Sequence, residues 1–341
     1  MKVLFRVDAS VTIGSGHVMR CLTLATALRK QHIDCHFLCR ETQGNLLALI
    51  TEQGFETFSL PCEPANELLD SQQSLAKLSF HYQLLVLDHY QLGYTYCKQM
   101  RSRCRYIMVI DDLANRTHDC DLLLDQNLLA NAANRYRKLV PAHCKTLTGP
   151  CYALLREEFY QIYPPRTQHQ ILVGFGGSDE QNLTSLAIKV IAQLKIPGIS
   201  ADIVIGANNP WREQLMSQLA AYPNFTLHIQ CNNMAELMAR ASLMLGAGGA
   251  THWERCITAL PGLVVVAADN QKAITEYLAE QGACIFLGMA DEITELSLTL
   301  QLQHYLTQPN LLAAVSQHAA AIVPKDAGTP LVVSAISKLI N

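Results

Sequence analysis

Apolar and polar positions along this chain follow two distinct rhythms. Short apolar runs alternate with longer amphipathic segments, one of which spans residues 18–28. In the first part of the chain, the short runs fall at residues 2–7, 36–38, 84–87, 106–110 and 122–124. Short strands separated by helical patterns are typical of βαβ units with a parallel sheet. We therefore expect an α/β domain at residues 1–150.

The strand rhythm restarts after a segment that contains Pro164 and Pro165, which fit poorly inside a helix or a sheet. Helical patterns at 183–194 and 235–241 separate the second set of strands. These strands are predicted at 171–175, 201–205, 225–229, 242–245, 263–266 and 284–287. The pattern predicts a connector at 151–169 and a second Rossmann-like domain at 170–341.

Charge and hydropathy narrow the classes of partner. The 341 residues carry a formal net charge of −3, which leaves no basic excess for binding nucleic acid. Charges at Lys2, Arg6 and Asp8 interrupt what would be the apolar core of a signal peptide, and no later stretch is long and apolar enough to span a membrane. We expect a cytoplasmic protein, with neither nucleic acid nor membrane as a partner.

The twelve cysteines are scattered along the chain without a CxxC pair or a flanking histidine repeat. Such spacing matches neither a structural zinc site nor a disulfide framework. We expect most of these cysteines to be reduced and buried as small apolar side chains.

A glycine-containing turn follows the first predicted strand and leads into a helix. Gly14 and Gly16 would let backbone N–H groups approach an anion at the helix start, although any tight strand-to-helix turn also uses glycine. The helix dipole disfavours a positive charge on His17, so this imidazole is a candidate base. A structural role for His17 is the alternative.

Polar residues also follow two later strands. Asp88 and Tyr90 come directly after residues 84–87, at the end of a strand where ligands of open α/β sheets bind. Capping by Asp88 and packing by Tyr90 are the structural alternatives. For the adjacent Asp111 and Asp112, we favour a helix cap for one of them over an acid and base pair.

The second half contains two further glycine turns. Gly176 and Gly177 end a strand before a helix, as in a phosphate-facing turn, but they fit a backbone pivot equally well. Gly248, Gly249 and Thr251 precede another helix and could present N–H groups to a diphosphate. Glu254 could accept hydrogen bonds from ribose hydroxyls, or it could simply complement the helix dipole.

Five segments together resemble a known family. KVLFRVDAS, IGSGHVMRCLTLA, LVLDHY, YALLREEFY and GAGGATHWERC are spread over nearly the whole chain. They are similar to the pseudaminic acid pathway hydrolases, which cleave UDP-2,4-diacetamido-2,4,6-trideoxy-β-L-altropyranose. The resemblance implies a GT-B-like fold, in which two Rossmann-like domains face each other across a cleft. The C-terminal domain would hold the nucleotide, and the sugar would face the N-terminal one.

The resemblance also implies a reaction and roles for single residues. The expected reaction is hydrolysis at the anomeric carbon with inversion and release of UDP, without a metal or other cofactor. His17 would be the general base, Tyr90 would position the sugar or the water, and Glu254 would hold the ribose. Asn270 would contact the substrate from the opposite wall.

Two departures from the family pattern affect this assignment. Ala250 stands where the family often has a small hydroxyl residue, so one side-chain contact to phosphate is in doubt. Residues 325–329 follow the family's glycine-rich end motif only in part, and we assign them no role.

Two other functions stay open on the sequence. A GT-B glycosyltransferase would need an acceptor pocket, and a nucleotide-sugar sensor would bind UDP without turnover. We expect a monomer whose partner is a small-molecule UDP-sugar.

Overall fold

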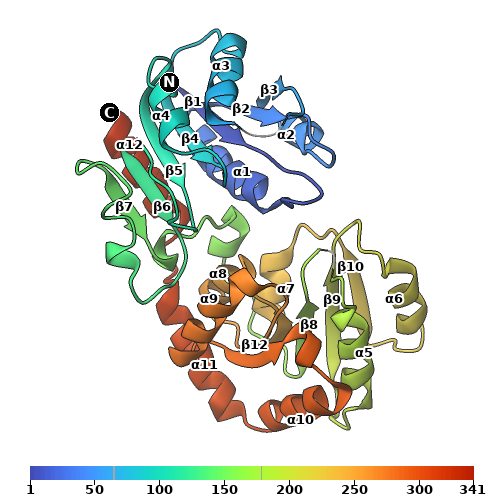
Figure 1. Cartoon of the computed structure of the whole chain (residues 1–341). Helices are drawn as coiled ribbons and strands as arrows, with labels where there is room; N and C mark the ends of the chain where they lie inside the picture. Colours follow the sequence, from blue (N-terminus) through green and yellow to red (C-terminus); the bar gives the residue numbers. More distant parts are fainter. Residues whose placement is uncertain (64–65, 178) are drawn as a thin grey trace. The chain divides into compact units, whose positions relative to one another are not determined.

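The chain folds into two compact units, each built on a parallel sheet. The computed structural model describes residues 1–341 except 64, 65 and 178 (Figure 1). Unit 1 comprises Met1–Arg156 and Asp326–Asn341, and unit 2 comprises Glu157–Lys325. The predicted α/β class is confirmed for both units.

Within the described residues, unit 1 contains a seven-stranded sheet of order β3-β2-β1-β4-β5-β6-β7. The strands are β1 (Lys2–Val7), β2 (Asp34–Arg40), β3 (Glu56–Leu60), β4 (Tyr82–Asp88), β5 (Cys104–Ile110), β6 (Leu122–Asp125) and β7 (Lys145–Thr148). All neighbouring strands pair in parallel, so their carboxyl ends share one edge of the sheet. The two edge strands of this sheet, β3 and β7, are absent from the strands that the sequence predicts.

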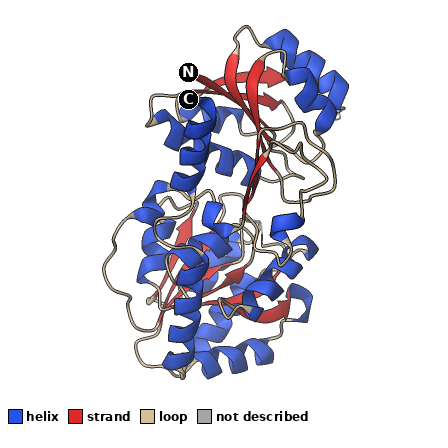
Figure 2. Cartoon of the chain, turned by 90° about the vertical axis from the view of Figure 1, so that its left-hand side faces the viewer, coloured by secondary structure: helices blue, strands red, loops and turns tan. Residues whose placement is uncertain are grey.

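Helices lie on both sides of this sheet, as Figure 2 shows. The elements outside the sheet are α1 (Gly16–Arg29), α2 (Leu47–Glu52), α3 (Glu67–Lys77), α4 (Tyr94–Met100), α12 (Thr329–Ile340) and the 3-10 turns η1 (Ala132–Asn134) and η2 (Pro150–Tyr152). Because both faces are covered, the inner strands are apolar throughout, and the central strand β1 is buried from Val3 to Val7.

The C-terminal helix α12 belongs to unit 1, although the sequence analysis assigned residues 170–341 to the second domain. Val332, Val333 and Ile336 of α12 are buried in the same apolar core as Val3 and Phe5 of β1. Figure 1 shows this red helix beside the strands of unit 1. The chain therefore passes between the units twice, after Arg156 and after Lys325.

Unit 2 contains, in the part that is described, a six-stranded sheet of order β10-β9-β8-β11-β12-β13. The strands are β8 (Gln170–Gly174), β9 (Ser200–Ile205), β10 (Phe225–Ile229), β11 (Leu243–Ala247), β12 (Gly262–Val266) and β13 (Ile285–Met289). They follow the predicted strands closely. These pairs are parallel as well.

The helices of unit 2 surround this sheet in the same way (Figure 2). They are α5 (Leu183–Gln193), α6 (Arg212–Leu219), α7 (Met234–Arg240), α8 (Thr251–Ile257), α9 (Asp269–Glu280), α10 (Glu295–Leu306), α11 (Pro309–Ile322) and the 3-10 turns η3 (Glu157–Tyr160) and η4 (Ala290–Glu292). Across both units, none of the helices in the described chain combines the length and apolar character needed to cross a bilayer.

Candidate functional site

In unit 1, the turn between β1 and α1 leaves backbone donors available. Residues 11–16 are exposed, and Gly14 has a φ of 80°, a conformation that favours glycine. Ser15 at the N-cap of α1 makes no side-chain capping hydrogen bond. The N-terminus of α1 therefore keeps free N–H groups and the positive end of the helix dipole at the carboxyl edge of the sheet.

His17, in the first turn of α1, is held by Asp88 at the end of β4. The imidazole Nδ1 lies 2.6 Å from Asp88 Oδ1, and both side chains are almost completely buried. Arg20 lies one helical turn after His17 and binds the same carboxylate with its Nε at 2.5 Å and its Nη2 at 2.7 Å. The strand exit and the helix start thus meet in one ionic cluster.

This cluster determines the protonation of Asp88 and orients His17. Burial alone raises the pKa of Asp88, but the charge of Arg20 and the hydrogen bonds from Arg20 and His17 outweigh burial and lower that pKa well below its usual range. Arg20 Nη2 also lies 3.0 Å from Nδ1, yet the shorter contact to an ionised carboxylate favours a proton on Nδ1. The other ring nitrogen, Nε2, is then able to accept a proton.

Tyr90 packs directly against His17. The two rings meet edge to face with centroids 4.5 Å apart, and the phenol oxygen lies 3.5 Å from Asp112 Oδ2. Burial and the neighbouring Asp112 carboxylate raise the pKa of Tyr90 to about 12, so the phenol stays protonated at neutral pH. The ring is 39% exposed and can therefore still contact a ligand.

His89 anchors the segment that carries Asp88 and Tyr90. Its Nδ1 accepts a hydrogen bond from the backbone N–H of Gln91, and its Nε2 lies 3.1 Å from Asp8 Oδ2. Asp8, at the end of β1, also binds the buried guanidinium of Arg6 at 2.6 and 2.9 Å. The buried contact between His89 and Asp8 therefore connects the ends of β1 and β4 beneath the cluster.

In unit 2, the turn between β11 and α8 also presents unused backbone donors. Gly249 has a φ of 88°, and no side chain caps α8. In the described part of the chain, the N–H groups of Gly249, Ala250 and Thr251 donate no hydrogen bond. A Cβ on Gly248 would lie 2.8 Å from His252 Nε2 and 3.1 Å from Thr275 Oγ1, so a larger residue there would displace these side chains.

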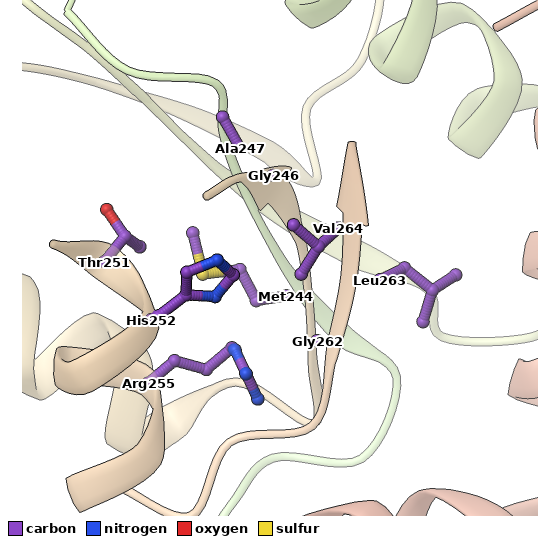
Figure 3. A pocket seen from close by; sticks show the side chains of 9 residues that line it. All are labelled: Met244, Gly246, Ala247, Thr251, His252, Arg255, Gly262, Leu263 and Val264. Carbon is purple, nitrogen blue, oxygen red and sulfur yellow. The ribbon is translucent and has the colours of Figure 1, made fainter. Parts of the chain in front are cut away.

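Beneath this turn, the first residues of α8 pack against the strands. Figure 3 shows His252 and Arg255 projecting from α8 toward Met244, Gly246 and Gly262 of β11 and β12. The space that these residues line is too small for a water molecule. Arg255 donates to the carbonyl oxygens of Leu260 and Ala283 and is buried. These buried side chains therefore pack beneath the turn between β11 and α8 and fix its position.

The other predicted residues of unit 2 fall on two helices near this turn. Glu254 lies on α8 and is half-buried, and Asn270 lies in the first turn of α9. The side chain of Asn270 is outside the described part of the structure. Its neighbour Gln271 holds a buried Oε1 without a hydrogen-bond partner among the described residues, and a Cβ on Gly248 would lie 3.3 Å from that atom.

The turn with Gly176 and Gly177 differs from the other two. Gly176 has a φ of 89°, but the N-terminus of α5 beyond it is already occupied. Asp179 accepts the N–H groups of Leu183 and Thr184 at 3.0 and 2.9 Å, and Asn182 accepts that of Ser185. A carboxylate at this helix start disfavours a phosphate bound to the N–H groups of α5. Both roles considered for Gly176 and Gly177, the phosphate-facing turn and the backbone pivot, stay predictions.

Asp111 and Asp112 do not cap a helix. No helix follows β5 before β6 in the described chain, and Asp111 Oδ2 instead accepts the N–H of Ala114 at 2.8 Å inside a turn. No three His, Cys, Asp or Glu side chains in the described chain form a group that could hold a metal ion.

Sequence reasoning missed Arg20 and Asp112 as members of the site. Arg20 Nη1 lies 3.4 Å from Asp112 Oδ2, so these two residues complete the cluster around Asp88. The spacing of His17 and Arg20 was the available signal, because residues three apart lie on the same face of a helix.

The comparisons with known proteins agree with the fold of both units. Residues 171–327 match the glycosyltransferase family 28 C-terminal domain. The fold is similar to that of MurG from Acinetobacter baumannii, a GT-B glycosyltransferase, with a TM-score of 0.67 at 17% identity over 99% of each chain.

Curated relatives cover most of the chain. The spore coat polysaccharide biosynthesis protein SpsG of Bacillus subtilis is 23% identical over 88% of this chain and 87% of its own length. The UDP-2,4-diacetamido-2,4,6-trideoxy-beta-L-altropyranose hydrolase of Campylobacter jejuni is 30% identical over 284 residues, which are 83% of this chain and 97% of that protein. With similarity at this level over nearly the whole relative, the chain belongs to the family of this UDP-sugar hydrolase.

Proposed function

We propose that this protein hydrolyses UDP-2,4-diacetamido-2,4,6-trideoxy-β-L-altropyranose to UDP and 2,4-diacetamido-2,4,6-trideoxy-L-altrose, with inversion at the anomeric carbon. The observation that carries the proposal is the contact of 2.6 Å between His17 Nδ1 and Asp88 Oδ1. It orients an imidazole at an exposed turn so that Nε2 can take a proton from water. Family membership supports the choice of substrate.

In this proposal, unit 1 activates the water. His17 Nε2 removes a proton as the water oxygen attacks the anomeric carbon, and the C–O bond to UDP breaks on the opposite face of the sugar. The Asp88 carboxylate stabilises the imidazolium that forms, as the buried acid of a catalytic triad does. The exposed face of Tyr90 positions the sugar or the water. A single displacement of this kind inverts the anomeric centre.

Unit 2 binds the nucleotide. The free N–H groups of Gly249, Ala250 and Thr251 would donate to the diphosphate, and they stabilise the charge that grows on it as the bond breaks. Glu254 would accept hydrogen bonds from the ribose hydroxyls, and Asn270 would contact the substrate. Because UDP departs as a stable anion and backbone donors meet its charge, the proposed reaction requires no metal.

NMR of the purified full-length protein tests the reaction directly. The protein is incubated in EDTA with the UDP-linked diacetamido sugar and, separately, with UDP-N-acetylglucosamine. We expect UDP and free sugar from the first substrate alone, with the inverted anomer appearing first. UDP binding without turnover would favour the nucleotide-sugar sensor, and turnover only with an added acceptor would favour the glycosyltransferase.

His17→Ala tests the base. General base catalysis contributes about 10²- to 10⁴-fold, so kcat should fall by that order while the affinity for UDP stays nearly unchanged. The matched control is His81→Ala, which removes an exposed imidazole just before β4 and should leave kcat unaltered. Equal kcat in His17→Ala and the wild type would exclude His17 as the base.

A further inference from the structure

Two thiols in unit 1 lie in contact, far along the strands from the candidate site. Cys120 Sγ and Cys144 Sγ are 3.5 Å apart, and both cysteines are unbonded. Cys120 is completely buried, whereas Cys144 is partly exposed. The two residues are 24 positions apart in the sequence, so the fold rather than the local chain brings them together.

The backbone on both sides of the pair is fixed by the sheet. Cys120 lies two residues before β6 and Cys144 one residue before β7, and these strands pair in parallel with Leu122 opposite Lys145. The N–H of Lys145 also donates to the carbonyl oxygen of Asp121 at 3.0 Å. Continued backwards, this register sets Cys144 opposite Asp121, one position from Cys120, and the two sulfurs already lie 3.5 Å apart. The two sulfurs can therefore bond with little movement of the chain.

The difference in exposure gives the two sulfurs separate roles. Oxidants reach a partly exposed thiol first, and a second thiol beside it can resolve the product. Cys144 is the accessible partner, and Cys120 has no route to solvent of its own.

We propose that Cys120 and Cys144 are a modification site at which a hydroperoxide forms a reversible disulfide. Cys144 Sγ attacks the peroxide O–O bond, which gives a sulfenic acid and releases the first molecule of water or alcohol. Cys120 Sγ then attacks the sulfenic sulfur, the S–O bond breaks, and the hydroxide leaves with the Cys120 proton as water. Two external thiols reverse the change and are themselves oxidised to a disulfide.

The disulfide would link the segments that lead into β6 and β7, at one edge of the sheet. Among the strands of the described chain, β7 has β6 as its single neighbour, and it spans four residues, Lys145–Thr148. The cross-link would close the loop from Cys120 to Cys144, which includes all of β6. Closing that loop restricts the unfolded chain, so oxidised unit 1 should unfold at a higher temperature than reduced unit 1.

Peptide mapping of the full-length protein tests the site. Reduced protein is treated with a few equivalents of hydrogen peroxide, blocked with N-ethylmaleimide, digested and analysed by mass spectrometry. We expect a linked peptide pair containing Cys120 and Cys144, and dithiothreitol should remove it. A thermal unfolding scan of the oxidised protein should show a raised Tm.

Two variants make the result specific. Cys144→Ser replaces the partly exposed thiol and should abolish both the linked peptide and the rise in Tm. Cys62→Ser, the matched control at an exposed cysteine, should retain both. The proposal is overturned if Cys144 is found as a sulfinic acid or as a mixed adduct while Cys120 stays reduced, or if Cys62→Ser loses the linked peptide.

Discussion

Asp88 decides which nitrogen of His17 carries the proton. Its carboxylate binds Nδ1 at 2.6 Å and stays ionised because Arg20 compensates its charge. A histidine held in this way presents Nε2 as the basic nitrogen. The tautomer of the proposed base therefore depends on three residues from α1 and β4. A substitution of any of them should change the rate of hydrolysis.

Asp88→Asn should lower kcat strongly while changing KM little. An amide in place of the carboxylate can offer its own N–H to Nδ1, which favours the wrong tautomer of His17. In a serine protease the same change costs about 10⁴-fold, and we expect a loss of about 10²- to 10⁴-fold here. Steady-state kinetics on the UDP-sugar measure it.

Asp112→Asn is the control for Asp88→Asn, because Asp112 touches Arg20 and Tyr90 only at 3.4 and 3.5 Å. Its kcat should change much less. Circular dichroism checks that both variants remain folded. If folded Asp88→Asn retained the wild-type kcat, His17 would not depend on Asp88.

Sequence reasoning located the residues of the site better than their partners. His17, Asp88 and Tyr90 were identified because strand exits and helix starts collect at one edge of a parallel sheet, and the structure brings these three together. Arg20 and Asp112 were missed. Which charged groups share a carboxylate depends on the packing of α1 against β4 and β5, and residue spacing does not determine that packing.

A second histidine makes the stability of unit 2 depend on pH. Burial, reinforced by Arg255, lowers the pKa of His252 from 6.5 to about 3. The unfolded chain therefore binds a proton below pH 6.5 that the folded chain does not. The stabilisation that this group contributes is complete above about pH 6.5 and is lost progressively as pH falls toward 3.

His252→Gln should weaken the dependence of the unfolding free energy of unit 2 on pH. The loss in the wild type is on the order of 1 kcal/mol for each pH unit in this window. A glutamine can still donate to Thr275 Oγ1, which His252 Nε2 contacts at 3.0 Å, but it does not titrate. Urea unfolding at pH 7 and pH 5 measures the effect. If the variant and the wild type lost the same unfolding free energy between pH 7 and pH 5, groups other than His252 would cause the pH dependence.

At the scale of elements, glycine allows the central strands of unit 2 to approach each other. Gly246 of β11 pairs with Gly174 of β8, and a Cβ on Gly246 would lie 2.3 Å from the Gly174 carbonyl oxygen. Backbone cannot move aside as a flexible side chain can. β11 leads directly into the turn at Gly248 and Gly249, so this pairing also fixes the position of the proposed diphosphate donors.

Gly246→Ala should destabilise unit 2 by about 1 to 3 kcal/mol, the usual cost of forcing extra volume into a packed core. It should also weaken UDP binding, because the strands must separate next to the turn. Gly177→Ala in the same unit is the control, since none of the described atoms beyond its chain neighbours lies within 4 Å of the added Cβ. Chemical denaturation and UDP titration provide the measurements, and similar stabilities for the two variants would contradict the argument.

The elements themselves were predictable to different degrees. The buried inner strands of both sheets were identified because parallel strands covered on both faces are continuous apolar runs. The edge strands β3 and β7 of unit 1 were missed because their sequences, ETFSL and KTLT, contain no run of apolar residues. The prediction that Asp111 or Asp112 caps a helix was wrong, because the described chain runs from β5 to β6 without a helix.

At the scale of the whole molecule, the last helix returns to the first unit. α12 shows the usual apolar face of a surface helix, with Val332, Val333 and Ile336 buried and Leu331 40% exposed. Such a pattern shows that a helix covers a core, but it does not show which core. The two-domain plan was therefore predictable from sequence, whereas the membership of residues 326–341 was not. The cytoplasmic location and the monomeric state stay predictions.

Removing residues 326–341 should consequently destabilise unit 1, at the opposite end of the chain. Burying one large aliphatic side chain contributes about 1.5 to 3 kcal/mol, and losing three of them approaches the 5 to 15 kcal/mol that stabilises a typical domain. Limited proteolysis should degrade residues 1–156 of the truncated protein and spare a fragment within Glu157–Lys325.

A point variant separates the packing of α12 from any other effect of truncation. Ile336 is completely buried, and Ile336→Ala should cost about 2 to 5 kcal/mol in unit 1 alone. Leu331→Ala on the same helix removes a partly exposed side chain and should cost far less. Hydrogen exchange read by mass spectrometry assigns each loss to its unit. If Ile336→Ala accelerated exchange in β8 and β11 rather than in β1 and β4, then α12 would stabilise the second unit, as the sequence alone had indicated.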